Sequence, residues 1–377
     1  MKLATRRTSV ALAAFATAGI SSVFLGTAPA TAAAGDACGV EGTLVSPGVC
    51  EARFTGGTTT FTPRADMTQL EVLLVGAGGS GEANNASGTS GYAAGGGGQV
   101  RIVDLSGTTT PITVAVPTPG TVGGVNNGTA QTVANGLNGN VDDTTALATG
   151  GASGSGNPGT SVPGTPSYGG GGGAGGAAAG ADGGAGVVVS TIAPAGSLFS
   201  GMTECFGGGA AVAVSGVTGV AGCGAGYSTS SGGSLVGPTA NSGGGGGALT
   251  GSFSSGASGL VVIRWNGTAT LAFDTAGIGA GVASQAVPAG AAPTAPATPV
   301  ASGFTFGGWY TDAALTTPAD FSQPLLASTT FYARWNATLA AAGLSIDPIA
   351  VSLGGGLLLA GGLGFVALGR RRTRDAD

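Results

Sequence analysis

The chain has 377 residues, of which 79 are glycine, 42% are hydrophobic and only 8% are charged. It contains no histidine, which excludes Ser-His-Asp and Cys-His catalysis and histidine metal sites. Between residues 35 and 348 there is no lysine, and five arginines against fifteen aspartates and glutamates leave a net charge of −10. Nucleic acids and anionic lipid surfaces require basic patches. We therefore expect no nucleic-acid partner and no lysine-based cross-link.

Residues 1–34 have the layout of a secretory signal peptide. Three basic residues precede an uncharged, mostly apolar run over residues 10–25, and small residues with A-x-A patterns follow at 30–34. The apolar run is short and leads directly into the cleavage-type residues, which disfavours the alternative of an N-terminal anchor helix. We expect an exported chain that begins near Ala33 or Gly35.

The other end of the sequence predicts a transmembrane helix over residues 349–369. Its uncharged stretch is 20 residues long, and at about 1.5 Å rise per residue it spans about 30 Å, the thickness of one hydrocarbon core. The basic tail that follows, residues 370–377, is typical of the cytoplasmic side of a membrane. We expect the membrane to be a partner of the chain through this helix.

A short tether, residues 337–348, precedes this helix. Its motif, together with the apolar span and the basic end, resembles the sortase sorting signals of Gram-positive surface proteins, a degenerate LPXTG signal in the L-A-x-T-G form of high-GC species. The resemblance implies sortase and peptidoglycan as partners. An alanine stands where the family has the threonine whose carbonyl sortase attacks, so the alternative is a chain that stays membrane-anchored. The motif residues are Leu339, Ala340, Ala341, Ala342 and Gly343.

The four cysteines all lie in the exported part, two of them in an N-terminal segment, residues 35–52. An even number of cysteines outside the cell indicates two disulfides. Three pairings are open, and we favour Cys38–Cys50 and Cys205–Cys223 because each closes a short loop. The alternative of a metal site is disfavoured, because spacings of 12 and 18 residues do not resemble those of cysteine metal sites.

Residues 53–266 form one block in which strand-like runs alternate with glycine tracts. The tracts lie at 95–98, 169–173 and 243–247. Runs of β-branched, aromatic and apolar residues predict strands at 58–62, 70–75, 99–105, 111–116, 186–191 and 259–265.

Three stretches of this block, TTTFTPRADMTQLEVLLVGAGG, GGGGQVRIVDLSGTTTPITVAV and GASGLVVIRW, resemble the glycine-rich domain of bacterial surface proteins. The resemblance implies a β-sandwich-like frame into which the glycine tracts insert as polyglycine II helices. Such helices have no internal hydrogen bonds and must pair laterally, and only glycine lets neighbouring backbones come so close. The alternative is flexible loops attached to a β frame.

Two patterns in this block imitate chemical sites. Residues 76–81 match G-x-G-x-x-G after a predicted strand, and Asp104 follows near the end of a later one. Six glycines in residues 82–99 exclude the helix that a dinucleotide site requires, so we expect no cofactor. The adjacent Asp142 and Asp143 favour a solvated turn over a Ca²⁺ ligand or a hydrolase pair.

Residues 267–336 differ in character from the glycine-rich block. LAFDTAGIGAGVASQAVPAG and GFTFGGWYTDAALTTPADFSQPLLASTTFYARW resemble the Listeria–Bacteroides repeat, the internalin-type B repeat of bacterial surface proteins. The resemblance implies a small β-grasp-like module. So small a domain needs large apolar side chains to form a core, which we favour over a carbohydrate-stacking surface. The motif residues assigned to this core are Phe304, Phe306, Gly307, Gly308, Trp309, Tyr310, Phe321, Tyr332 and Trp335.

Together these features predict a mainly β, exported protein displayed at the membrane or cell wall. We expect a non-catalytic structural or adhesive protein without catalytic, cofactor-binding or metal-binding residues. One alternative is a receptor for an extracellular glycan or host protein. A less favoured alternative is a secreted hydrolase that works through carboxylates.

Overall fold

The computed structural model describes residues 37–84, 90–142, 147–164, 166–214, 217–228, 235–249 and 252–338. The predicted signal peptide, the sorting motif at 339–343 and the predicted transmembrane helix at 349–369 lie outside these residues. Over the described ranges no helix has the length and apolarity that crossing a membrane requires. The described chain is mainly β, and the single helix within it is the four-residue α1 (Val189–Ile192).

The chain divides into two compact units. Unit 1 runs to Ala269 and also takes in Val287–Ala291 and Pro324–Ala327, and unit 2 contains the remainder of the repeat segment.

A five-stranded antiparallel sheet forms the centre of unit 1. Two of its inner strands, β22 and β4, are buried on both faces, so their sequences are largely apolar rather than alternating, with one charged residue in each. The sheet pairs the beginning of the glycine-rich segment with its end, because β22 lies between β2 and β4. The strand order is β1 (Thr43–Ser46), β2 (Val49–Phe54), β22 (Leu260–Asn266), β4 (Leu70–Val75) and β7 (Val100–Asp104).

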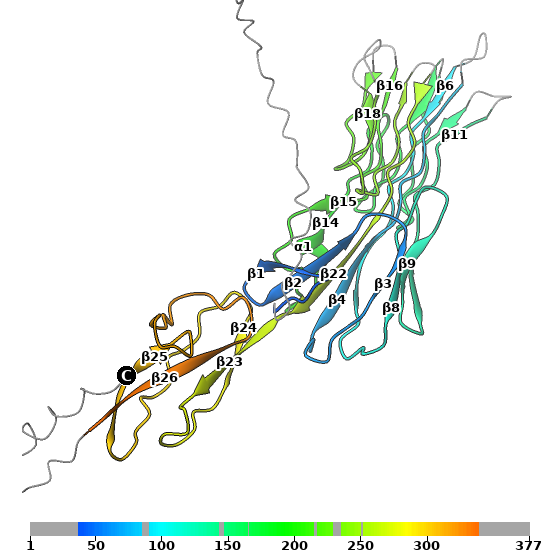
Figure 1. Cartoon of the computed structure of the whole chain (residues 1–377). Helices are drawn as coiled ribbons and strands as arrows, with labels where there is room; N and C mark the ends of the chain where they lie inside the picture. The colour runs from blue at the N-terminus through cyan, green and yellow to red at the C-terminus, as the bar shows by residue number, and fades with distance from the viewer. Residues whose placement is uncertain are drawn as a thin grey trace, which may run out of the picture. The chain divides into compact units, whose positions relative to one another are not determined.

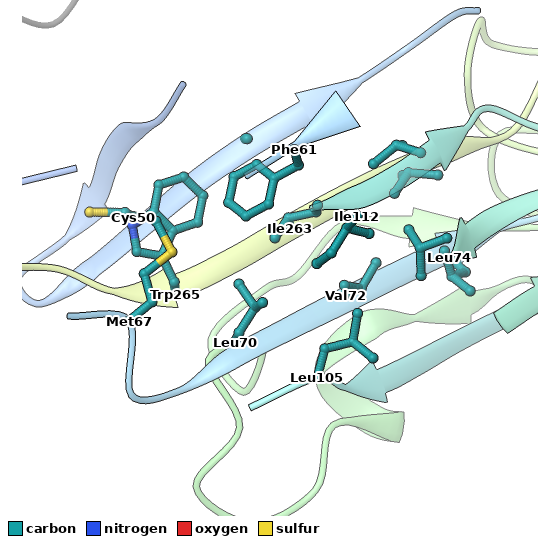
Figure 2. Packing of buried hydrophobic residues seen from close by; sticks show 14 of the residues in the cluster. Cys50, Phe61, Met67, Leu70, Val72, Leu74, Leu105, Ile112, Ile263 and Trp265 are labelled. Carbon is teal, nitrogen blue, oxygen red and sulfur yellow. The ribbon is translucent and has the colours of Figure 1, made fainter. Parts of the chain in front are cut away.

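A second, four-stranded sheet covers one face of this central sheet. The two sheets share a hydrophobic core in which the rings of Phe61 and Trp265 lie 5.3 Å apart between centroids. Figure 2 shows Phe61 and Ile112 of the second sheet beside Ile263 and Val72 of the central sheet. The strand order of the second sheet is β10 (Ala130–Val133), β9 (Gly123–Asn126), β8 (Ile112–Ala115) and β3 (Thr58–Phe61).

The opposite face of the central sheet is covered by the segment 187–206. This segment contains β14 (Val187–Val188), α1 and β15 (Cys205–Phe206). The buried side chains of Val189 and Phe199 pack there against Leu73 of β4 and other residues of the sheet. We call this packing the second core.

The strand predicted over residues 186–191 is therefore wrong beyond Val188. The strand ends at Val188 and α1 begins at Val189. The amide of Ala193 donates to the carbonyl of Val189 at 3.1 Å. The helical turn buries Val189 completely in the second core. Burial against the sheet thus overrides the strand preference of three consecutive valines.

Next to the sheets, the glycine tracts form a hydrogen-bonded array. Gly95 and Gly98 both donate to the 243–247 tract, whereas the two glycines between them donate to Leu137 and Gly172, with N···O distances of 2.8–2.9 Å. N–H groups three residues apart thus reach the same neighbour, and those between them reach two others. We call this array the glycine lattice, and it comprises residues 76–81, 95–98, 134–139, 150–154, 169–173, 207–211 and 243–247.

Close approach of backbones explains why the lattice is made of glycine. A Cβ added at Gly96 would lie 2.1 Å from the carbonyl oxygen of Ala152, and one at Gly97 would lie 1.9 Å from that of Gly207. Neither of these glycines has the positive φ that favours glycine at turns. Packing, and not turn geometry, therefore requires glycine in this tract.

Short strand pairs extend the lattice tracts at one end of unit 1, where Figure 1 shows β6, β11, β16 and β18. Two of the pairings, β13 with β6 and β16 with β20, are parallel. The bounds of these strands are β5 (Glu82–Asn84), β6 (Gly91–Ala93), β11 (Asn140–Val141), β12 (Ala148–Thr149), β13 (Ser167–Gly169), β16 (Val212–Val214), β17 (Val217–Thr218), β18 (Tyr227–Ser228), β19 (Leu235–Val236), β20 (Ala248–Leu249) and β21 (Ser252–Phe253).

Unit 2 is built on a four-stranded sheet. β23 pairs with β26 in parallel, and β25 pairs with β26 antiparallel, with a shift of register between Phe306 and Trp309. The strand order is β24 (Gln285–Pro288), β23 (Thr268–Asp274), β26 (Thr329–Ala337) and β25 (Phe304–Tyr310).

Candidate functional site

Three charged side chains form a row across the central sheet on its second-core face. Glu51 of β2 pairs in register with Arg264 of β22, and Arg264 pairs with Glu71 of β4. Their exposed fractions are only 5%, 9% and 7% for Glu51, Arg264 and Glu71. The Nε and Nη2 atoms of Arg264 each lie 2.7 Å from Oε2 of Glu51. We call these three residues the charged row.

The charged row binds the loop that covers the second core. Arg264 Nη1 donates to the carbonyl of Leu198 at 2.9 Å, and its guanidinium carbon lies 4.9 Å from the centre of the Phe199 ring. Oε2 of Glu71 accepts from Ser197 Oγ at 2.5 Å and from the amide of Leu198 at 3.1 Å. Buried charges require such partners, so the row fixes the position of this loop.

A groove of about 560 Å³ lies at the edge of unit 1. Arg53 and Glu204 form a two-bond ion pair in its wall, with Nη1···Oε2 at 2.9 Å and Nη2···Oε1 at 2.6 Å. The hydrogen bond to Glu204 raises the pKa of Arg53; burial lowers it by less, and the hydrogen bond to Glu51 raises it further. The rest of the lining combines hydroxyl groups with apolar surface, and includes Thr55, Cys205, Phe206, Thr239, Asn241, Ser242 and Leu260.

Both predicted disulfides are present. Cys38 and Cys50 have Cα atoms 5.4 Å apart, and those of Cys205 and Cys223 are 6.0 Å apart. Cys50 lies in β2 within the core that contains Trp265, and Cys205 lines the groove. One disulfide therefore closes the start of the central sheet, and the other closes a loop that begins in β15 and contains the lattice tract 207–211.

Removing either disulfide should destabilise unit 1 by a similar amount. The two bonds close loops of 12 and 18 residues, for which the chain-entropy relation gives about 3 kcal/mol each. The Cys38→Ser/Cys50→Ser and Cys205→Ser/Cys223→Ser variants should each unfold at lower urea concentration than the parent, as followed by tryptophan fluorescence. An unchanged midpoint in either double variant would contradict this expectation.

Among the described residues, no helix follows either of the two patterns that imitate chemical sites. The glycines at 76–81 belong to the lattice and lead into β5, and Asp104 ends β7, which runs antiparallel to β4. Asp142 is exposed, and Asp143 lies outside the described residues. Across the residues that the structure describes, no three His, Cys, Asp or Glu side chains form a group that could hold a metal ion.

The aromatic side chains of unit 2 form a continuous row of rings. Trp309 and Phe331 are buried, with exposed fractions of 7% and 6%, whereas Phe304 at the end of the row is 39% exposed. Ring centroids lie 5.3 Å apart for Phe306 and Trp309, and 5.5 Å apart for Phe306 and Trp335. The row continues through Phe273, which contacts Trp309, Phe321 and Phe331.

The two tyrosines of the repeat motif lie opposite each other on β25 and β26. Phe331 is buried, so its neighbour Tyr332 points to the other face of the sheet. Arg334 donates from Nη1 to the hydroxyl of Tyr310 at 3.1 Å. Gly307 and Gly308 occupy the register shift of β25, where Gly308 has φ of 109°.

Replacing Trp309 with alanine should destabilise unit 2 by about 3–5 kcal/mol, the usual cost of deleting a buried aromatic ring. Phe304→Ala is the matched control, because its side chain is exposed at the end of the row and should cost under about 1 kcal/mol. Thermal unfolding of the full chain by near-UV circular dichroism measures both. Equal losses in the two variants would show that Trp309 is not part of a core.

Comparison with known families gives two matches. The model of the glycine-rich domain matches residues 54–266, and that of the Listeria–Bacteroides repeat domain matches residues 270–334. No curated protein and no solved structure is significantly similar to the chain. The two domain families are consistent with a bacterial surface protein, and the repeat and the two disulfides are consistent with an extracellular location. Because the glycine-rich match covers more than half of the 377 residues, this protein belongs to the glycine-rich domain family.

Proposed function

We propose that the protein is a non-catalytic, C-terminally anchored bacterial surface protein with a structural or adhesive role. Unit 1 is its exposed head, a β-sandwich-like frame filled by polyglycine II helices, and the repeat is a β-grasp-like spacer. The observation that carries this proposal is the three-direction hydrogen bonding of the glycine lattice. Three residues per turn and exclusively lateral pairing are the properties of this helix type.

The lattice suits an exterior scaffold for a physical reason. Its backbone groups are bonded to three neighbours, so a local opening must break contacts to several tracts at once. Ordering glycine costs more backbone entropy than ordering any other residue, and the packed sheets, together with the Cys205–Cys223 disulfide around one tract, supply the frame that offsets this cost. Unit 1 would therefore resist local unfolding, which is what a structural role requires, and this role needs no catalytic or ligand-binding site.

A receptor for a glycan or host protein is the second candidate, and the groove supports it. Its volume of about 560 Å³ lies in the range of small-molecule sites, which combine apolar lining with a few placed polar groups. The Arg53–Glu204 pair and the hydroxyl of Thr239 offer the donors and acceptors that sugar hydroxyls require.

Binding arrays separate these two candidates. The full-length protein in detergent is applied to arrays of glycans and host matrix proteins, beside a Thr239→Trp variant that fills the groove. Absence of binding by the unmodified chain favours the structural role. Binding that the Thr239→Trp variant loses favours the receptor, and binding that it keeps places the adhesive surface elsewhere.

Hydrolase screening tests the non-catalytic assignment. The full chain should turn over no glycoside, ester or peptide substrate. Turnover that Asp142→Asn abolishes would overturn the assignment in favour of the carboxylate hydrolase.

Cell fractionation tests the anchor. Because Ala342 replaces the threonine of the sorting motif, the protein should be extracted by detergent and not require muralytic enzymes. An Ala342→Thr variant should move into the wall fraction if sortase and peptidoglycan are otherwise suitable partners. Release of the unmodified chain by wall digestion alone would contradict membrane anchoring.

A further inference from the structure

A cluster around Glu71, at one end of the charged row, contains the groups that an intramolecular ester requires. Ser197 supplies a hydroxyl, Gln69 a carboxamide, and Glu71 a carboxylate that contacts both. We propose that Ser197 Oγ and Gln69 Cδ form an intramolecular ester in the mature protein, with Glu71 as the proton-transfer group.

The geometry brings the three groups together through one carboxylate. Ser197 Oγ donates to Oε2 of Glu71 at 2.5 Å, and Gln69 Nε2 donates to Oε1 at 2.9 Å. Nε2 of Gln69 also donates to the carbonyl of Gly196 at 3.1 Å, which holds the amide beside the residue that precedes Ser197. The amide of Phe199 donates to Ser197 Oγ at 3.1 Å and helps to fix its position.

The reaction balances without any co-reactant. Ser197 Oγ attacks Cδ of Gln69 as its proton passes to Glu71, which acts as general base. The Cδ–Nε2 bond then breaks, and Glu71 returns the proton to the departing nitrogen. One O–C bond forms, one C–N bond breaks and one ammonia leaves, with no change of oxidation state.

The surroundings favour formation of the ester and its persistence. Ser197 and Glu71 are only 6% and 7% exposed, which limits the access of water to the ester from the side of Ser197. Gln69 is half-buried, which leaves a route for ammonia to solvent. Holding the hydroxyl and the amide on the two oxygens of one carboxylate replaces a bimolecular encounter by an intramolecular one, which strongly accelerates acyl transfer.

The bond would join segments that are 128 positions apart. It would tie the residue before β4 to the loop that covers the second core, in addition to the hydrogen bonds of the charged row. This inference is independent of what the head binds.

Peptide mass spectrometry of the full-length protein tests the proposal. After reduction, denaturation and cleavage at Arg and Glu, residues 65–71 should remain joined to residues 102–204, with the combined mass lower by one ammonia. These peptides are not neighbours in the sequence, and neither contains cysteine. Hydroxylamine should separate them and leave a hydroxamate at position 69, a product that simple deamidation does not give.

Variants identify the reacting groups. Ser197→Ala should free residues 65–71 from residues 102–204. Gln69→Glu adds a cleavage site and should free residues 65–69, and Glu71→Gln removes one and should free residues 65–82. Ser200→Ala, which changes a neighbouring exposed serine, should keep the two peptides joined. A wild-type chain whose peptide 65–71 is free and carries an intact Gln69 amide overturns the proposal. Joined peptides in Ser197→Ala would equally overturn the assignment of the nucleophile.

Discussion

Replacing Gly97 with alanine is expected to destabilise unit 1 by about 3 kcal/mol or more, the upper range for overpacking a close-packed interior. The new Cβ would lie 1.9 Å from the oxygen and 2.4 Å from the carbon of the Gly207 carbonyl. Both atoms belong to a backbone that cannot rotate away as a side chain can. The amide of Gly97 also donates to Gly172 at 2.9 Å, so a shift to relieve the clash breaks a second tract.

Gly237→Ala is the control for this experiment. A Cβ at Gly237 meets nothing within 4 Å, and the residue has no positive φ. The change should stay within about 0.5 kcal/mol of the parent. Urea unfolding measures both variants, with the buried Trp265 as a probe of unit 1. If Gly97→Ala and Gly237→Ala unfold at the same urea concentration, the lattice is not close-packed.

Replacing Glu51 with alanine should be the most damaging change among the charged residues. It leaves the guanidinium of Arg264, 9% exposed, without the carboxylate that lies 2.7 Å from it. Removing one partner of a buried ion pair costs about 3–5 kcal/mol, because the remaining charge stays buried and uncompensated. The same urea unfolding experiment measures the loss.

The ion pair of Arg53 with Glu204 supplies the comparison. Its side chains are 37% and 46% exposed, and exposed pairs contribute at most about 1 kcal/mol. Glu204→Ala should therefore change stability little. A Glu51→Met/Arg264→Met double variant should recover much of the loss seen in Glu51→Ala. A Glu51→Ala variant no less stable than Glu204→Ala would show that Arg264 is hydrated in the folded state.

Local sequence patterns predicted much of the β framework. The runs at 70–75 and 259–265 correspond to β4 and β22, because strands buried on both faces have largely apolar sequences. The strand prediction for 186–191 was wrong beyond Val188, because the contacts that bury Val189 come from residues distant in the sequence. The pairing of the glycine tracts also joins residues that are distant in the sequence, so no local sequence pattern predicts which tracts pair.

The candidate site was less predictable. Glu71 and Arg264 each interrupt an apolar strand sequence, and a charge in such a run is the available signal for a buried ionic contact. The partners of Glu71 and Arg264 come from β2 and from the loop at 196–199, so the local sequence does not indicate which groups these charges contact. The groove likewise combines segments around residues 53, 205 and 240, which only the fold brings together.

The amides of Gly95–Gly98 donate to three different neighbouring segments. This arrangement constrains how many residues can be inserted into or deleted from a glycine tract. Adding one residue to a tract would turn every later N–H by a third of a revolution and aim it at the wrong neighbour. Adding three would return each later N–H to its original direction, at a position three residues further along the tract. Insertions and deletions inside these tracts should therefore be tolerated in multiples of three, so that unit 1 grows or shrinks in triplet steps.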